Sequence, residues 1–258
     1  SFRLRDRTEP GPMNTPLGFV GELDGYQFLV FLHERGHLSV VLVRPTADAA
    51  LMRLHEEAAF DAACAAIPVL AQWTDPARAE PTSGVLVGGA LRNVYRSQLL
   101  LDGLVTVGDA VATTTPTRGR GVAMACLQIG ALLRLLDEGA DPVRVAGPFD
   151  AWCEQQIAPW VADHIAIDGG MERRWRGEDL DLSGPLTSDL IADATLADPR
   201  IAAHAGSYFN MTALPETLRP AEPLAREVYG AGWRPPLTEG PSRDELVELI
   251  SAGASVPA

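Results

Sequence analysis

The chain contains no lysine. Its 21 basic side chains are all arginines, set against 34 aspartates and glutamates, so 258 residues carry a net charge of −13. A surface this acidic repels phosphate backbones and anionic lipid headgroups, which argues against a nucleic-acid or membrane-surface role. A catalytic step that depends on a lysine also has no residue in these 258 to perform it.

Cysteines and long apolar runs are scarce as well. The three cysteines, Cys64, Cys126 and Cys153, lack the spacing of a metal site or a disulfide framework, which favours a reduced, cytoplasmic protein. No apolar run approaches the length of a membrane span. With 47% hydrophobic residues, the chain is instead long and apolar enough for a large folded core.

A glycine-rich dinucleotide fingerprint is also missing. The nearest string, Gly119-Arg120-Gly121-Val122-Ala123-Met124, lacks the third glycine. It also lacks an acidic ribose ligand beyond a second strand, and Gly84, Gly88 and Gly89 have the wrong spacing. These residues therefore predict no unit that binds the ADP half of a dinucleotide.

One segment nevertheless has the composition of a cofactor site. The apolar run Leu104–Val107 predicts a strand that leads into Gly108-Asp109-Ala110, followed by Pro116 and a Gly119-x-Gly121 helix start. An aspartate at the end of a strand can accept hydrogen bonds from a polyol. The start of a helix offers free N–H groups and a positive dipole end to an electron-rich ligand.

In type and order, these residues resemble the FAD-dependent oxidoreductases of the p-hydroxybenzoate hydroxylase type, which also include flavin halogenases and geranylgeranyl reductases. The resemblance covers about residues 1–139 and the rear half of such an enzyme. It implies FAD as cofactor, with NAD(P)H as reductant. The residues implied to contact the ribityl chain and isoalloxazine ring are Gly108, Asp109, Pro116, Gly119, Arg120 and Gly121. A preceding ADP-binding segment, supplied in cis or in trans, is expected because this family opens with one.

The resemblance implies a monooxygenase or hydroxylase that acts on an apolar organic small molecule. Two alternatives stay open: a flavin-dependent reductase of a prenyl-type double bond, and a degenerate relative that binds a hydrophobic ligand without turnover. Halogenation would need a lysine from outside this chain. The expected partner is a small-molecule substrate, with no nucleic acid and no stable membrane insertion.

The expected fold is α+β in three parts. Residues 1–103 form an antiparallel substrate-domain sheet, with strands at 1–5, 26–32 and 38–43 and further strands within 82–101. Residues 104–139 form the FAD-contacting strand and helix, and residues 140–258 a helical region. The helix 121–137 is apolar almost all round, so we expect burial on most sides, including Cys126.

In relatives of this type the sheet forms a wall above the flavin ring. Along residues 26–32, alternate side chains point to opposite faces, so Tyr26, Phe28 and Val30 share one face and Gln27, Leu29 and Phe31 the other. Either set can face the substrate, with the other facing helices. The candidate substrate contacts are Tyr26, Phe28, Val30 and Tyr95, with Asn93 beside the last.

Two further features have ordinary explanations. His33-Glu34-Arg35-Gly36-His37 matches the zinc-protease string, but that chemistry needs a helix, and the flanking strands with Gly36 predict a hairpin turn. Arg118 and Arg120 flank the helix-start glycines and could approach a cofactor or substrate carboxylate. Exposure to solvent is the default for arginine.

Overall fold

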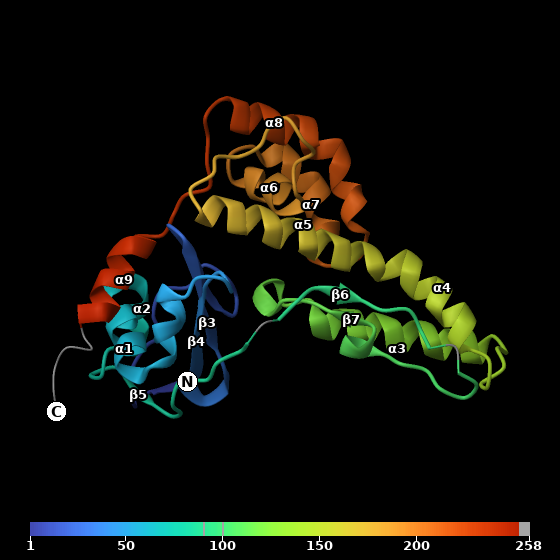
Figure 1. Ribbon diagram of the computed structural model, residues 1–258, viewed down its shortest axis with the longest axis horizontal. Coiled ribbons are helices and arrows are strands. Elements are labelled where there is room, and N and C mark those ends of the chain that lie inside the picture. The colour runs from blue at the N-terminus through green and yellow to red at the C-terminus, as the bar shows by residue number, and fades with distance from the viewer. Residues whose placement is uncertain (90, 100, 253–258) are drawn as a thin grey trace. The chain divides into compact units, whose positions relative to one another are not determined.

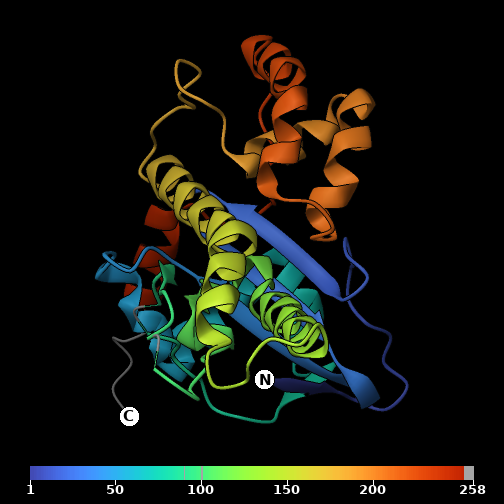
Figure 2. The same ribbon diagram turned by 90° about the vertical axis from the view of Figure 1, so that its right-hand side faces the viewer.

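The computed structural model describes residues 1–89, 91–99 and 101–252 (Figures 1 and 2). It is a mixed α and β protein, 50% helical and 12% strand, with a small antiparallel sheet. None of the helices in the described ranges is both long and apolar enough to cross a bilayer. The chain forms two compact units: unit 1 contains residues 1–89, 172–178 and the segment from 236, and unit 2 contains residues 90–171 and 179–235.

Unit 1 is built on a five-stranded sheet in the order β2-β3-β4-β1-β5, in which every paired strand is antiparallel. The strands are β1 (Phe2–Leu4), β2 (Gly18–Leu23), β3 (Tyr26–Leu32), β4 (His37–Val43) and β5 (Ala79–Pro81). The predicted hairpin between β3 and β4 is confirmed, with Val30 opposite Val40. Arg35 and Gly36 turn the chain with positive φ angles.

Helices cover one face of this sheet (Figure 1). They are the 3-10 helix η2 (Ala50–His55), α1 (Glu57–Ala66), α2 (Pro68–Thr74) and α9 (Arg243–Ala252). Tyr26, Phe28 and Val30 pack among their apolar side chains in the core of unit 1. The Tyr26 hydroxyl donates to the carbonyl oxygen of Pro241 at 2.8 Å, which fastens the C-terminal segment to the sheet.

Unit 2 is mostly helical, with one short hairpin. Helices α6 (Ser188–Asp193), α7 (Ala202–Phe209) and α8 (Glu222–Gly230) group together beside α5 (Ala158–Trp175) (Figures 1 and 2). They share one core through Trp160 of α5, Ile191 of α6, Tyr208 of α7 and Tyr229 of α8. The elements are β6 (Val94–Tyr95), η3 (Gly108–Ala110), β7 (Ala112–Thr113), η4 (Pro116–Arg118), α3 (Gly121–Asp137), α4 (Ala146–Gln156), α5 (Ala158–Trp175), α6 (Ser188–Asp193), η5 (Ala194–Leu196), η6 (Pro199–Ile201), α7 (Ala202–Phe209), η7 (Pro215–Ala221) and α8 (Glu222–Gly230).

The prediction of a strand at Leu104–Val107 is wrong. Across the described residues no strand pairs with this segment, and the side chain of Gln98 takes the place of a neighbouring strand. Gln98 Oε1 accepts from the Thr106 N–H at 2.8 Å, and Gln98 Nε2 donates to the Thr106 carbonyl at 2.9 Å. Of the further strands expected within residues 82–101, the described residues form only the two-residue β6, and residues 90 and 100 lie outside the described ranges.

The bounds of α3 are confirmed, but its expected burial on most sides is wrong. Only Met124, Gln128 and Ala131 are buried, and these form a single stripe along the helix. The opposite side exposes the apolar residues Val122 (78%), Ile129 (46%) and Leu133 (55%), and Leu127 (40%) is exposed beside the buried stripe. Cys126 is exposed with them. An apolar sequence predicts a contact surface, but it cannot say whether a partner element is present.

The two units also divide the chain differently from the predicted boundaries at 103 and 139. Residues 104–139 are part of unit 2 together with most of the helical region, and the last segment returns to the sheet of unit 1. The return depends on single contacts such as the Thr238 N–H donating to the Glu22 carbonyl at 2.7 Å. Composition carries no information on such long-range pairings.

Candidate functional site

The segment from Gly108 to Gly121 in unit 2 connects the extended stretch before it to helix α3. Gly108 has a φ of 64°, a conformation that favours glycine. Its N–H donates to Oε1 of the buried Gln128 at 2.6 Å, so α3 fixes the start of the segment directly. The backbone therefore turns at Gly108 in a way that places Asp109 beside the beginning of the same helix.

Asp109 is exposed, and within the described residues its carboxylate accepts no hydrogen bond. Its carbonyl oxygen is held by the Thr113 hydroxyl at 2.9 Å, so the backbone is fixed while the side chain stays free. The carboxylate atom Oδ1 lies 4.0 Å from the point where a Cβ on Gly121 would stand. A free acceptor thus lies next to the first residue of α3.

The turn before α3 leaves its backbone accessible. Gly119 has a φ of 65°, its N–H donates to the Pro116 carbonyl at 2.9 Å, and nothing lies within 4 Å of where its Cβ would be. The N–H of Met124 donates to the Arg120 carbonyl at 2.9 Å. The amides of residues 121–123 therefore precede the hydrogen-bonded turns of the helix, and no side chain caps them. Open amides, missing Cβ atoms and a free carboxylate occur together here.

Arg120 does not point to solvent, so the default expectation for it is wrong. Its side chain is 9% exposed, and Nη1 lies 3.0 Å from Oδ2 of Asp163 on α5. The guanidinium also stacks on Trp160 and Tyr208, at 4.7 Å and 4.4 Å from the ring centroids. Because these partners occupy the guanidinium, only the backbone of Arg120 remains to contact a cofactor.

His164 follows Asp163 on α5 and is completely buried. Burial and then the charge of Arg120 lower the pKa of its imidazole to about 4, so the ring is neutral at physiological pH. Neither ring nitrogen has a hydrogen-bond partner among the described residues. The core of unit 2 next to Arg120 therefore contains a buried, neutral imidazole as well as the Arg120–Asp163 ion pair.

The structure places three of the predicted substrate contacts in the core of unit 1. Tyr26, Phe28 and Val30 are at most 1% exposed, because their face of β3 is the one that the helices of unit 1 cover. The opposite face of β3 carries Gln27 and Leu29. Gln27 is 3% exposed, and its Oε1 has no hydrogen-bond partner among the described residues.

Tyr95 is not available to a substrate through its hydroxyl. The hydroxyl is buried, and the ring packs against the core of unit 2. Burial raises the pKa of Tyr95 to about 12. Asn93, the neighbouring candidate, is engaged by Asp168 and Thr115 inside the same unit.

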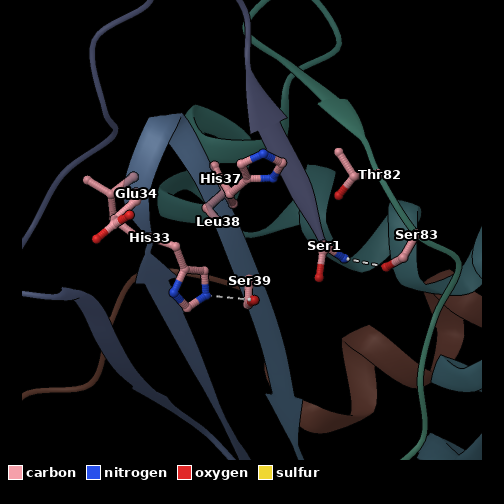
Figure 3. Close-up of a pocket in the computed structure, with 9 residues that line it drawn as sticks. Ser1, His33, Glu34, His37, Leu38, Ser39, Thr82 and Ser83 are labelled. Carbon is pink, nitrogen blue, oxygen red and sulfur yellow. Dashed lines mark hydrogen bonds between the residues drawn. The ribbon is translucent and has the colours of Figure 1, made fainter.

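The histidine hairpin of unit 1 lines a broadly open depression of about 750 Å³ (Figure 3). Figure 3 shows His33 turned toward Ser39, with Nε2 3.0 Å from Oγ, whereas the ring of His37 points away from that of His33. The predicted turn is confirmed by η1 (Glu34–Gly36). The part of the chain that the structure describes holds no group of three or more His, Cys, Asp or Glu side chains placed to bind a metal ion.

Several supporting residues had no place in the motif. Gln128 and Gln98 hold Gly108 and Thr106, and Asp163 and Asp168 hold the turn before α3. Gln128 could have been identified from the sequence, because a polar residue in an apolar helix needs a hydrogen-bond partner when it is buried. The carboxylates of α5 gave none, since aspartates on a helix are usually exposed.

Comparison with known proteins adds no relative: no family model, no curated protein and no solved structure matches the chain.

Proposed function

We propose that this chain is the cofactor-contacting and substrate-binding portion of an FAD-dependent oxidoreductase, a monooxygenase or hydroxylase of an apolar organic molecule. The observation that supports it best is Asp109: an exposed carboxylate without a hydrogen-bond partner in the described residues, 4.0 Å from the Cβ position of Gly121. A carboxylate in that place can accept hydrogen bonds from the hydroxyls of a ribityl chain. The family resemblance of the surrounding residues supports the same cofactor.

The residues present fit a flavin. Asp109 would hold the ribityl hydroxyls, and the backbone at Gly119 and Gly121 would lie against the ring, where the absence of Cβ atoms permits close approach. Pro116 holds the turn through its carbonyl bond to the Gly119 N–H. The amides at the start of α3 would stabilise negative charge on the pyrimidine edge of the reduced ring. When bound, flavin supplies the redox chemistry with NAD(P)H and oxygen.

The adenine half of FAD would need a nucleotide-binding unit in addition to these residues. The paired strands in the described ranges are all antiparallel, whereas a dinucleotide fold uses a parallel sheet. Two surfaces are suited to contact such a unit: the exposed apolar side of α3, and the extended segment Leu104–Val107, which pairs with no strand of the described chain. We propose that this unit is supplied in cis or in trans.

The other face of β3 offers no better substrate site. Gln27 and Leu29 are 3% and 5% exposed, and of that face only Phe31 is partly exposed. We therefore assign no substrate contact to β3.

A non-catalytic binding protein is the second candidate, because the described residues contain no parallel nucleotide-binding unit. The absorption spectrum of the full-length protein separates the two. A yellow protein that consumes NAD(P)H supports the oxidoreductase. A colourless protein that stays without flavin after FAD is added supports the binding protein and contradicts the proposal.

A titration of the 258-residue chain tests the contacts themselves. Because we assign no contact to the adenine half, we expect riboflavin, FMN and FAD to bind with similar dissociation constants, roughly between 1 µM and 1 mM. Nanomolar binding of FAD would contradict this assignment.

The variant Asp109→Ala removes a charge-assisted acceptor worth about 1.5–3 kcal/mol, so we expect binding to weaken by about 10- to 150-fold. Asp137→Ala is the matched control, because Asp137 is an exposed carboxylate at the far end of α3, about 24 Å along the helix axis. Equal affinities of the two variants would refute the role of Asp109.

A further inference from the structure

The turn between Thr115 and Gly121 has little structure of its own. It consists of the three-residue 3-10 helix Pro116–Arg118, a left-handed glycine and the uncapped start of α3. Such a short segment cannot hold a fixed shape by its internal bonds alone. A cofactor that packs against backbone atoms requires them at fixed positions, to within about 0.5 Å.

Helix α5 is hydrogen-bonded to the beginning of the turn. Oδ2 of Asp168 accepts from the Thr115 hydroxyl at 2.8 Å and from Nδ2 of Asn93 at 2.7 Å. Oδ1 of Asn93 in turn accepts from the Thr115 N–H at 2.8 Å. These three bonds close a ring that fixes both the side chain and the backbone of Thr115.

The same helix forms an ion pair with the last residue before α3. Asp163 pairs with Arg120 at 3.0 Å and accepts from the Tyr208 hydroxyl at 2.8 Å through the same oxygen. The guanidinium also lies over the rings of Trp160 and Tyr208, which stack on each other with their centroids 5.7 Å apart. Arg120 cannot shift without breaking a buried ion pair, so the first residue before α3 is fixed as well.

Both ends of the turn are bound by the same helix. Asp163 and Asp168 lie five residues apart on α5, about 7.5 Å along its axis, and they bind Arg120 and Thr115. A single rigid helix therefore sets both ends. Within the turn, Nη2 of Arg118 lies 3.7 Å from Oδ2 of Asp189 on α6.

Stability alone does not explain the Arg120–Asp163 pair. A buried ion pair costs so much desolvation that apolar residues of similar volume often stabilise a protein as well or better. What a buried, hydrogen-bonded carboxylate does provide is a unique geometry. That geometry is needed where the turn presents Gly119 and Gly121.

We propose that Asp163 and Asp168 of α5, with Asn93, are positioning residues that set the shape of the Thr115–Gly121 turn for flavin binding. This rests on the proposed function, because it assigns the turn to the cofactor. The helical region is then part of the binding machinery, although none of these side chains touches the ligand.

The test uses the 258-residue chain with Asp168→Ala, Asp168→Asn and the control Glu172→Gln, an exposed carboxylate on the same helix. Riboflavin binding is followed by fluorescence quenching, and the environment of the bound ring by its visible circular dichroism. We expect Asp168→Ala to bind about tenfold more weakly with an altered dichroism band. Asp168→Asn, which keeps an acceptor oxygen, should bind riboflavin within about threefold of wild type. Glu172→Gln should bind it as the wild type does. Equal binding and equal dichroism of the alanine variant and the control would overturn the proposal.

Two further measurements keep the test decisive. If Asp168→Ala does not fold, Thr115→Val removes one bond to the same oxygen and leaves Asn93 in place; unchanged binding and dichroism there would also overturn the proposal. If the wild type binds no riboflavin, the proposed function fails. Hydrogen exchange across residues 115–121 then decides the positioning role: faster exchange in the Asp168→Asn or Thr115→Val variant than in Glu172→Gln supports it, and equal exchange refutes it.

Discussion

Replacing Asp163 by asparagine tests how strongly the buried cluster of unit 2 holds the start of α3. The Arg120 and Asp163 side chains are 9% and 5% exposed, with 3.0 Å between Nη1 and Oδ2. Removing the negative charge leaves the guanidinium buried without a counterion, which costs about 3–5 kcal/mol in comparable cases. The cation–π contacts to Trp160 and Tyr208 remain, and the amide oxygen can still accept a hydrogen bond. We therefore expect a loss near the lower end, about 3 kcal/mol.

The assay is urea unfolding followed by tryptophan fluorescence and by circular dichroism. In a thermal scan, the same loss of about 3 kcal/mol would lower the melting temperature by roughly 6–12 °C. The matched control is Asp179→Asn, because the Arg234–Asp179 pair is exposed (40% and 76%) and its removal should leave the curve unchanged. The double variant Arg120→Met with Asp163→Leu should recover most of the stability, since two apolar side chains leave no buried charge. A loss below about 1 kcal/mol in Asp163→Asn would refute the reasoning.

Two other predictions concern the same region. The pKa of His164 is lowered to about 4 in the folded state, against about 6.5 in the unfolded state. Between these values only the unfolded state binds the proton, so the free energy of unfolding falls by roughly 3 kcal/mol as the pH drops from 6.5 toward 4. Urea unfolding at several pH values should show a flatter decline in His164→Gln, and parallel curves would contradict it. Gly119→Ala should destabilise the chain by about 1 kcal/mol and weaken riboflavin binding, because the φ of Gly119 is 65° and a Cβ would stand where the ring approaches. The control is Gly147→Ala in α4, which has no neighbour within 4 Å of its Cβ position and should change neither stability nor binding.

Sequence predicted best what depends on neighbours in the chain. The β3–β4 hairpin and its Glu34–Gly36 turn follow from period-two apolar runs around a glycine, and the bounds of α3 follow from Gly121 and Gly139 at its ends. These features are confirmed because local pattern and local structure agree.

What sequence missed depends on long-range partners. Alternation does not show which face of β3 packs on helices, since both faces are largely apolar, and the predicted contacts Tyr26, Phe28 and Val30 lie in the core. The apolar run 104–107 predicted a strand, but a strand needs a neighbour, and here Gln98 supplies the hydrogen bonds. The motif located Asp109 and the glycines of the candidate site. The carboxylates of α5 that hold the turn come from residues some fifty positions further along the chain.

The most direct test of the central claim is an amide chemical-shift map of the chain titrated with riboflavin. If Asp109 and the start of α3 hold the ribityl chain and the ring, the largest shifts will fall on the amides of Asp109, Gly119 and Gly121, and Asp109→Ala will remove them. Shifts confined to other regions, such as the depression at His33 and Ser39, or no shifts at all, would contradict it.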